Sequence, residues 1–243
     1  MIRRSVLLLE EEKASDTMEN EEEQYLFEKM PVPRAVATLA VPTIISQVVT
    51  IIYNLADTFF VGQLGDPLMV AAVSLVSPWF NLLTALGNLF GLGGSSLISR
   101  MMGLKKHEDI KYVSAFSIWG GAAVTLLFSI LTYLFRGPLL NFLGASPDTY
   151  SYAEDYLRWV VVFGGVPTMA SLALGHLLRS EGHAKQASAG MMFGGILNVI
   201  LDPVFIFGFH LNVAGAAMAT ALSNTASVVF FVVQIGRAHV RTP

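Results

Sequence analysis

Long stretches without charge constrain this chain more than any other feature. From Pro42 to Ser99 the only charged side chains are Asp57 and Asp66. The whole chain of 243 residues is 53% hydrophobic and only 14% charged, whereas soluble domains carry about 25% charged residues. Because lipid offers no hydrogen bonds to the backbone, apolar segments of this length cross membranes as helices. The sequence therefore predicts an all-α membrane protein with several spans.

Six segments are long enough to cross a hydrocarbon layer about 30 Å thick, at about 1.5 Å per residue. We expect these helices at about residues 33–61, 68–99, 112–135, 150–178, 186–207 and 214–235. Glycine and proline mark several of the junctions, as in Gly65–Pro67, Gly137–Pro138 and Gly208. Residues 31–235 are therefore predicted to form one six-helix bundle.

The two ends of the chain differ from this bundle. Nine of the 18 acidic residues fall in the first 28 positions, so we predict a polar, acidic tail over residues 1–30. Residues 236–243 do not continue a membrane protein, and we interpret them as a non-native tail. The net charge of −3 reflects mainly the acidic tail and gives no reason to expect nucleic-acid binding. The absence of cysteine excludes disulfides and thiolate metal sites.

Basic residues in the short connections indicate the orientation of the bundle. The connection between the second and third helices and that between the fourth and fifth carry six of them: Arg100, Lys105, Lys106, Lys111, Arg179 and Lys185. The connections after the first and fifth helices carry none, and only Arg136 and Arg158 run against the pattern. By the positive-inside rule we expect both chain termini of the bundle to be cytoplasmic, in the plasma (inner) membrane. Asp57 and Asp202 then both lie in the outer half.

Asp202 interrupts an otherwise apolar run, at a cost of about 2.5–3.5 kcal/mol on insertion scales, so it predicts a functional site. Asn198 lies one helical turn before it, on a stripe of small and polar residues. Pro203 follows directly and frees the carbonyl of Val199 from its helical hydrogen bond. A carboxylate, an amide oxygen and a free carbonyl suit a hard cation or a proton.

Two further helices carry polar faces. The first helix carries Ser46, Thr50, Tyr53 or Asn54, and Asp57 at helical spacing, and the sixth carries Thr220 and Asn224. No Lys or Arg falls in the predicted outer halves of the first, second, fifth and sixth helices. The acids must therefore be neutralised by protons, a metal cation or a cationic substrate.

Three stretches resemble the multidrug and toxic compound extrusion (MATE) family. Pro33–Gly65, with its ending DTFFVGQLG from Asp57 onward, is similar to the first helix of that family. Leu178–Gly182 resembles its turn between the fourth and fifth helices. The most specific match is Asn198–Pro203 followed by Val213–Thr220. The lead-in Leu26-Phe27-Glu28-Lys29 suggests the MepA-like branch.

The resemblance implies a cation-coupled antiporter, driven by Na⁺ or H⁺, that exports cationic amphipathic drugs by alternating access. It is not an enzyme in this interpretation and needs no cofactor beyond the coupling ion. Its partners are membrane lipids and small organic cations as substrates. The residues matching the family's cation site are Asp57, Asn198, Asp202 and Thr220, supported by Tyr53, Pro203 and Asn224.

The length of the chain departs from the family pattern. MATE transporters have twelve spans in two six-helix lobes, and this chain resembles only the N-terminal lobe. We therefore expect a lobe fragment whose C-terminal lobe is missing. A six-helix chain that dimerises is the alternative.

Other interpretations stay open at this point. A lipid or oligosaccharide flippase of the same superfamily would share the fold, and two membrane aspartates also occur in intramembrane aspartyl enzymes. The latter need a Gly-x-Gly-Asp motif, which precedes neither Asp57 nor Asp202. Asn198 could serve only as a hydrogen-bonding contact between helices, and Thr220 only as a small packing residue. Gly190, Gly194 and Gly195 are expected to form close-packing surfaces.

Overall fold

The structure is a computed structural model that describes residues 30–104 and 107–241. Within these residues every regular element is a helix, and no strand occurs. In chain order the elements are α2 (Val32–Gly62), α3 (Pro67–Gly103), α4 (His107–Leu134), α5 (Arg136–Phe142), α6 (Pro147–Leu157), η2 (Arg158–Phe163), α7 (Gly165–Ser180), α8 (Ala184–Pro203), η3 (Val204–Gly208) and α9 (Asn212–Arg241). The predicted fold class, an all-α membrane protein, is confirmed. The predicted acidic tail lies outside the described residues, apart from its last residue.

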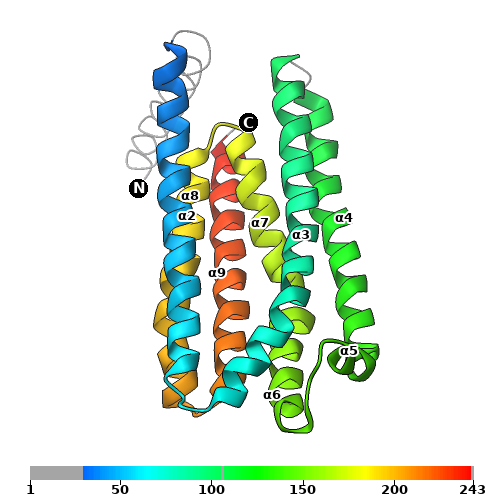
Figure 1. Cartoon of the computed structure of the whole chain (residues 1–243). Helices are drawn as coiled ribbons and strands as arrows, with labels where there is room; N and C mark the ends of the chain where they lie inside the picture. The colour runs from blue at the N-terminus through cyan, green and yellow to red at the C-terminus, as the bar shows by residue number, and fades with distance from the viewer. Residues whose placement is uncertain (1–29, 105–106, 242–243) are drawn as a thin grey trace, which may run out of the picture.

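The long helices stand roughly parallel, with α9 near the centre of the bundle (Figure 1). α2 packs mainly against α8, while α3 packs against α7 and α4. α9 lies against both α8 and α7 and so joins the two halves of the bundle. We name the two ends of the bundle by the connections that they carry. The α2–α3 end carries Gln63–Asp66, and the α7–α8 end carries Glu181–His183.

Six spans are present if one bent pair is counted as a single span. Five helices are long and apolar enough on their own: Val32–Gly62, Pro67–Gly103, Asp109–Leu134, Ala184–Gly208 and Asn212–Gln234. The sixth is Pro147–Phe163 with Gly165–Ser180, two segments that meet at an angle of 47°. The helix α9 continues to Arg241, into the stretch that the sequence analysis set apart as a tail.

The helix predicted over residues 150–178 is interrupted within the span. The span bends after the π-helical segment η2, where the amide of Gly164 donates to the carbonyl of Trp159 five residues earlier. A Cβ on Gly164 would lie 2.8 Å from the carbonyl oxygen of Val160, so only glycine fits the bend. Pro167 lacks an N–H and cannot bond back to Phe163. Gly164 and Pro167 together account for the break.

The predicted fifth helix also changes geometry near its end. α8 ends at Pro203 and continues as the π-helical η3, in which the amide of Phe209 donates to the carbonyl of Val204 at 2.9 Å. A proline without an N–H favours this switch in hydrogen bonding, because the regular ladder is already interrupted there.

The short helix α5 was not predicted; it lies in the connection between the third and fourth spans. Its first residue, Arg136, forms a salt bridge of 2.6 Å with Glu154 of α6. The hydrogen bond to Glu154 raises the pKa of the Arg136 guanidinium. Arg158 approaches the same carboxylate at 3.6 Å. The two arginines that run against the charge pattern thus share an acidic partner.

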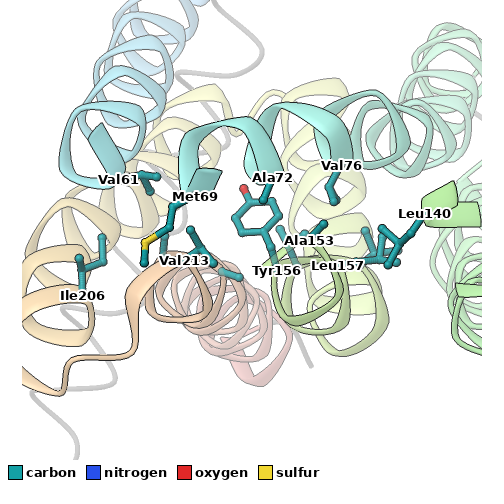
Figure 2. Packing of buried hydrophobic residues seen from close by; sticks show 14 of the residues in the cluster. Val61, Met69, Ala72, Val76, Leu140, Ala153, Tyr156, Leu157, Ile206 and Val213 are labelled. Carbon is teal, nitrogen blue, oxygen red and sulfur yellow. The ribbon is translucent and has the colours of Figure 1, made fainter. Parts of the chain in front are cut away.

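An apolar core fixes the helices at the α2–α3 end (Figure 2). Val61 of α2 and Ile206 of η3 belong to it, with Met69 and Ala72 of α3 and Tyr156 of α6. These side chains are nearly fully buried, at 0–8% exposed. The core therefore holds α2 and the end of α8 at a common depth.

Candidate cation site and cavity

Asn198 is the centre of a polar cluster between α8 and α9. Its amide nitrogen donates to Oδ1 of Asp202 and to Oγ1 of Thr220, each at 3.4 Å. Asn198 is 2% exposed and Asp202 is fully buried. The one-turn spacing on α8 places the amide beside the carboxylate, and the packing of α9 on α8 brings Thr220 to the same point. Three of the four predicted cation ligands are thus joined directly.

Asp57 approaches this cluster from α2. Its carboxylate is within electrostatic range of Asp202. Two contacts hold the end of α2 beside η3, which follows Asp202. The ring centroids of Phe60 and Phe207 lie 6.4 Å apart, and Val61 and Ile206 belong to the same apolar core. The expectation that the two acids lie at one depth agrees with this packing.

Three buried oxygens of this cluster have no hydrogen-bond partner: Oδ1 of Asp57, Oδ1 of Asn198 and Oδ2 of Asp202. Among the described residues, no Lys or Arg forms a salt bridge with either acid. Unpartnered buried oxygens are costly, so a site of this kind fits a ligand that supplies positive charge or protons. The donors are all oxygens, as hard cations prefer. The described residues hold no group of three His, Cys, Asp or Glu side chains that would suit a transition metal.

The supporting residues lie around the cluster without bonding to it. Tyr53, one turn before Asp57, is within electrostatic range of that carboxylate and packs against Gly195. Asn224, one turn after Thr220, donates to Oγ1 of Thr168 on α7 at 2.9 Å. Asn224 therefore links α9 to α7 rather than reaching the acids. Pro203 ends α8 directly after Asp202.

Tyr156 is a residue that the sequence analysis missed. It is 6% exposed on α6, and both Asp57 and Asp202 act on its phenol electrostatically. No polar stripe marks it in the sequence, because its helix carries several tyrosines and acids. Only the fold of α6 against α3 and α9 shows that this tyrosine, rather than Tyr150 or Tyr152, faces the acids.

A cavity of about 450 Å³ extends from the cluster towards the α7–α8 end. Five helices line it: α2, α3, α7, α8 and α9. Its lining holds neutral polar and apolar side chains and no acidic residue, lysine or arginine: Gln47, Thr50, Tyr53, Asn88, Leu92, Ser171, Leu172, His176, Met191, Gly194, Gly195, Asn198, Thr220, Ser223, Asn224 and Ser227. Asn198 and Thr220 thus belong to both the polar cluster and the cavity wall.

The glycines of α8 allow the helices around this cavity to approach one another. A Cβ on Gly190 would lie 2.1 Å from the ring of Phe231, and one on Gly194 would lie 2.0 Å from Oγ of Ser227. A Cβ on Gly195 would lie 3.0 Å from the ring of Tyr53. Gly190 and Gly194 therefore allow α9 to pack closely against α8, and Gly195 allows α2 to do so. The expectation of close-packing glycines is confirmed.

Comparison with known proteins points to one family. The MatE family model matches residues 42–204. The multidrug export protein MepA of Staphylococcus aureus (strain NCTC 8325 / PS 47) is 39% identical over 214 residues, which cover 88% of this chain and 47% of MepA. MepA of Staphylococcus saprophyticus is 38% identical over the same length.

Solved structures agree with the sequence relatives. An outward-facing multidrug resistance MATE family transporter of the MOP superfamily superposes with a TM-score of 0.82 at 30% identity, over 89% of this chain and 47% of the other. The named relatives are transport proteins, not enzymes. The chain spans about half the length of the relatives that it matches. Because the family model covers more than half of the chain, the chain belongs to the MatE family of membrane transporters.

Proposed function

We propose that this chain is the N-terminal lobe of a cation-coupled antiporter that exports cationic amphipathic compounds. The observation that carries the proposal is the pairing of two membrane-embedded carboxylates, Asp57 and Asp202, with unpartnered buried oxygens and no salt bridge to a Lys or Arg among the described residues. Acids in such a position are costly unless a cation or proton neutralises them. The MepA relatives are named multidrug export proteins, which supports export as the direction of transport.

The coupling ion, Na⁺ or H⁺, would bind between α2, α8 and α9. Asp57 and Asp202 supply charge, while Asn198 and Thr220 supply neutral oxygens. Asn198 already holds Asp202 and Thr220 through its amide nitrogen, which leaves its Oδ1 free to face the ion. Binding would remove the repulsion between the acids and draw α2 towards α8 and α9. That movement gives the ion a way to favour one conformation of the lobe over another.

The cavity beside this site suits an organic substrate. Its volume of about 450 Å³ lies within the range of pockets for drug-sized ligands. The lining mixes amides and hydroxyls with Leu92, Leu172 and Met191, and flexible methionine tolerates ligands of different shapes. Asn198 and Thr220 face both sites, so ion and substrate would compete for the same side chains. Exchange of one for the other is the basis of antiport.

The place of the lobe in the cell follows from the same proposal. The lobe lies in the plasma membrane with its first and last helices both ending on the cytoplasmic side, so the α7–α8 end faces the cytoplasm and the α2–α3 end faces outside. A second six-helix lobe completes the transport pathway, because the named relatives are about twice as long as the chain.

Proteoliposomes that hold the full-length transporter containing this lobe test the proposal. Ethidium should cross the vesicle membrane against its own gradient only when a sodium or pH gradient of the correct direction is imposed. One of the two gradients should suffice alone. Ethidium movement that ignores both gradients would contradict ion coupling. A cell-envelope defect on deletion, without any change in drug sensitivity, would favour lipid or oligosaccharide flipping instead.

A further inference from the structure

The bend between η2 and α7 leaves backbone carbonyls without helical partners. The N–H of Gly164 donates to the carbonyl of Trp159, five residues back, and that of Thr168 donates to Gly164, four residues back. Of the residues between these two donors, Pro167 has no N–H, so two N–H groups remain for the four carbonyls of residues 160–163. Inside a membrane every backbone carbonyl needs a donor. Two of these carbonyls therefore need a donor from outside the backbone of their own span.

One such donor comes from α4. The hydroxyl of Ser129 donates to the carbonyl of Val161 at 3.0 Å. Ser129 is 1% exposed and Val161 is fully buried, so water does not replace this bond. α4 packs against both η2 and α7. The side chain of Ser129 thus holds the backbone of the bend from a neighbouring helix.

A second hydroxyl of α4 lies beside the bend and is not used. Thr125, one turn before Ser129, is fully buried, and its Oγ1 has no hydrogen-bond partner. A Cβ on Gly165 would lie 2.7 Å from Oγ of Ser129 and 3.5 Å from Cγ2 of Thr125. The methyl group of Thr125 therefore faces the bend. A rotation about χ1 would turn its hydroxyl towards the bend instead, since threonine populates two rotamers in helices.

The idle hydroxyl of Thr125 requires an explanation. A buried hydroxyl without a partner costs free energy. Other helical threonines bond to the carbonyl one turn back, as Thr50 does with Ser46 and Thr225 with Ala221, whereas Thr125 does not. A second state of the bend, in which one of the carbonyls of residues 160–163 moves towards Thr125, would give this hydroxyl its partner.

The bend lies between the cation site and the cavity. On one side of it, α6 carries Tyr156, on whose phenol both Asp57 and Asp202 act electrostatically. On the other side, Thr168 of α7 accepts a hydrogen bond from Asn224, which lines the cavity. A change of the bend would therefore move a group beside the acids relative to a group beside the cavity.

We propose that the bend at Gly164 is a hinge with two states, which two hydroxyl groups of α4 hold in turn. Ser129 holds the bent state of this structure, and Thr125 holds a straighter one. The use of this hinge in transport, where occupancy of the cation site sets its state, rests on the proposed function. The two states themselves rest only on the contacts of α4 with the bend.

Spin-label distances across the bend measure the two states. Cysteines replace Ser151 on α6 and Ser180 on α7 in the full-length transporter without other cysteines, and the lobe itself contains none. The straighter state gives the longer distance. Ser129→Ala should raise the ratio of long to short distances about fivefold, as the loss of one hydrogen bond does. Thr132→Val is the matched control, because its hydroxyl bonds to Trp79 of α3 and not to the bend; it should leave the ratio unchanged.

A second substitution distinguishes a hinge from loosened packing. Thr125→Val removes only the hydroxyl, and when it is added to Ser129→Ala it should bring the ratio back towards the parental value. Loosened packing predicts a further departure, because two defects in one helix contact add. Saturating Na⁺ or low pH should change the parental ratio, and Asp202→Asn should abolish that response.

An unchanged ratio in Ser129→Ala would overturn the proposal, and so would a further rise when Thr125→Val is added. A parental ratio that ignores both ions would overturn the link between the hinge and the cation site. If the two substitutions act as expected while ethidium transport ignores ion gradients, the hinge stands and the proposed ion coupling fails.

Discussion

The amide nitrogen of Asn198 lies 3.4 Å from Oδ1 of Asp202, one turn further along α8. The same nitrogen reaches Thr220 on α9 at 3.4 Å, so a single amide holds a buried carboxylate and a hydroxyl from two helices. Its own oxygen has no hydrogen-bond partner. The amide therefore joins a carboxylate and a hydroxyl from two helices, and the carboxylate of Asp57 is within electrostatic range of Asp202. Transport is a property of the full-length transporter, so every transport measurement uses the full-length protein.

Removing the neutral ligands should weaken ion binding without abolishing transport. Asn198→Ala and Thr220→Ala each delete one uncharged oxygen, which costs roughly 1–2 kcal/mol and therefore about five- to thirtyfold in affinity. The ion concentration for half-maximal ethidium transport should rise by that factor in proteoliposomes. Thr220→Ser keeps the hydroxyl and serves as the control. An unchanged half-maximal concentration in both alanine variants would exclude them as ligands.

A methyl group on Gly190 should disturb the packing of α9 against α8. Its Cβ would lie 2.1 Å from Cε1 of the buried Phe231, and overpacking of this kind costs about 1–3 kcal/mol. Gly190→Ala should lower the melting temperature in detergent, and the further change Phe231→Leu should restore part of it. Gly93→Ala is the matched control, because no neighbouring atom lies within 4 Å of the added carbon. Equal melting temperatures for the Gly190 and Gly93 variants would contradict this packing.

The bend between η2 and α7 should depend on Gly164. A Cβ there would lie 2.8 Å from one backbone carbonyl oxygen and 2.9 Å from another, and backbone cannot move aside as a side chain can. Gly164→Ala should therefore reduce stability by at least as much as Gly190→Ala. It should also change the distance between spin labels at Ser151 and Ser180, on either side of the bend. An unaltered distance together with unaltered stability would show that the bend does not need glycine.

The orientation of the lobe can be mapped with single cysteines. Substitutions at Gly103 and Glu181 should be labelled by an impermeant reagent from the cytoplasm, and those at Asp66 and Asn212 from the outside. The reason is the excess of basic residues on the connections at the α7–α8 end. Labelling of the Glu181 variant from outside would show that the lobe has the opposite orientation, with Arg179 nearer the outer surface.

Much of the fold follows from the sequence because apolar length and helical spacing are local properties. The acid, amide and proline of Asn198–Pro203 predict a polar cluster without any knowledge of the neighbouring helices. The sequence also contains the residues that favour the break after η2, namely Gly164, Gly165 and Pro167. The apolar stretch around them is nevertheless long enough to be interpreted as one continuous span. A helix bends where backbone carbonyls lose their hydrogen-bond partners, and hydropathy contains no information about these hydrogen bonds.

Two residues could not be placed from the sequence. Tyr156 faces the acids only because α6 packs against α3 and α9, and its neighbours Tyr150 and Tyr152 are chemically identical. Arg179 has the sequence context of an ordinary basic residue at a helix end. Its inward direction depends on Ser46, 133 residues away in the chain, and on Met191, which follows on the next helix; both meet it only in the folded bundle.

The charge of Asp202 is the central claim, and one substitution tests it most directly. Asp202→Asn keeps the size of the side chain and removes the charge, so the protein should insert and express normally while gradient-driven ethidium transport falls at least a hundredfold. Asp148→Asn, at an exposed position in the first turn of α6, should transport at the parental rate in the same proteoliposomes. Comparing sodium and pH gradients in these vesicles also identifies the coupling ion. An Asp202→Asn protein that transports at the parental rate under either gradient would contradict the account.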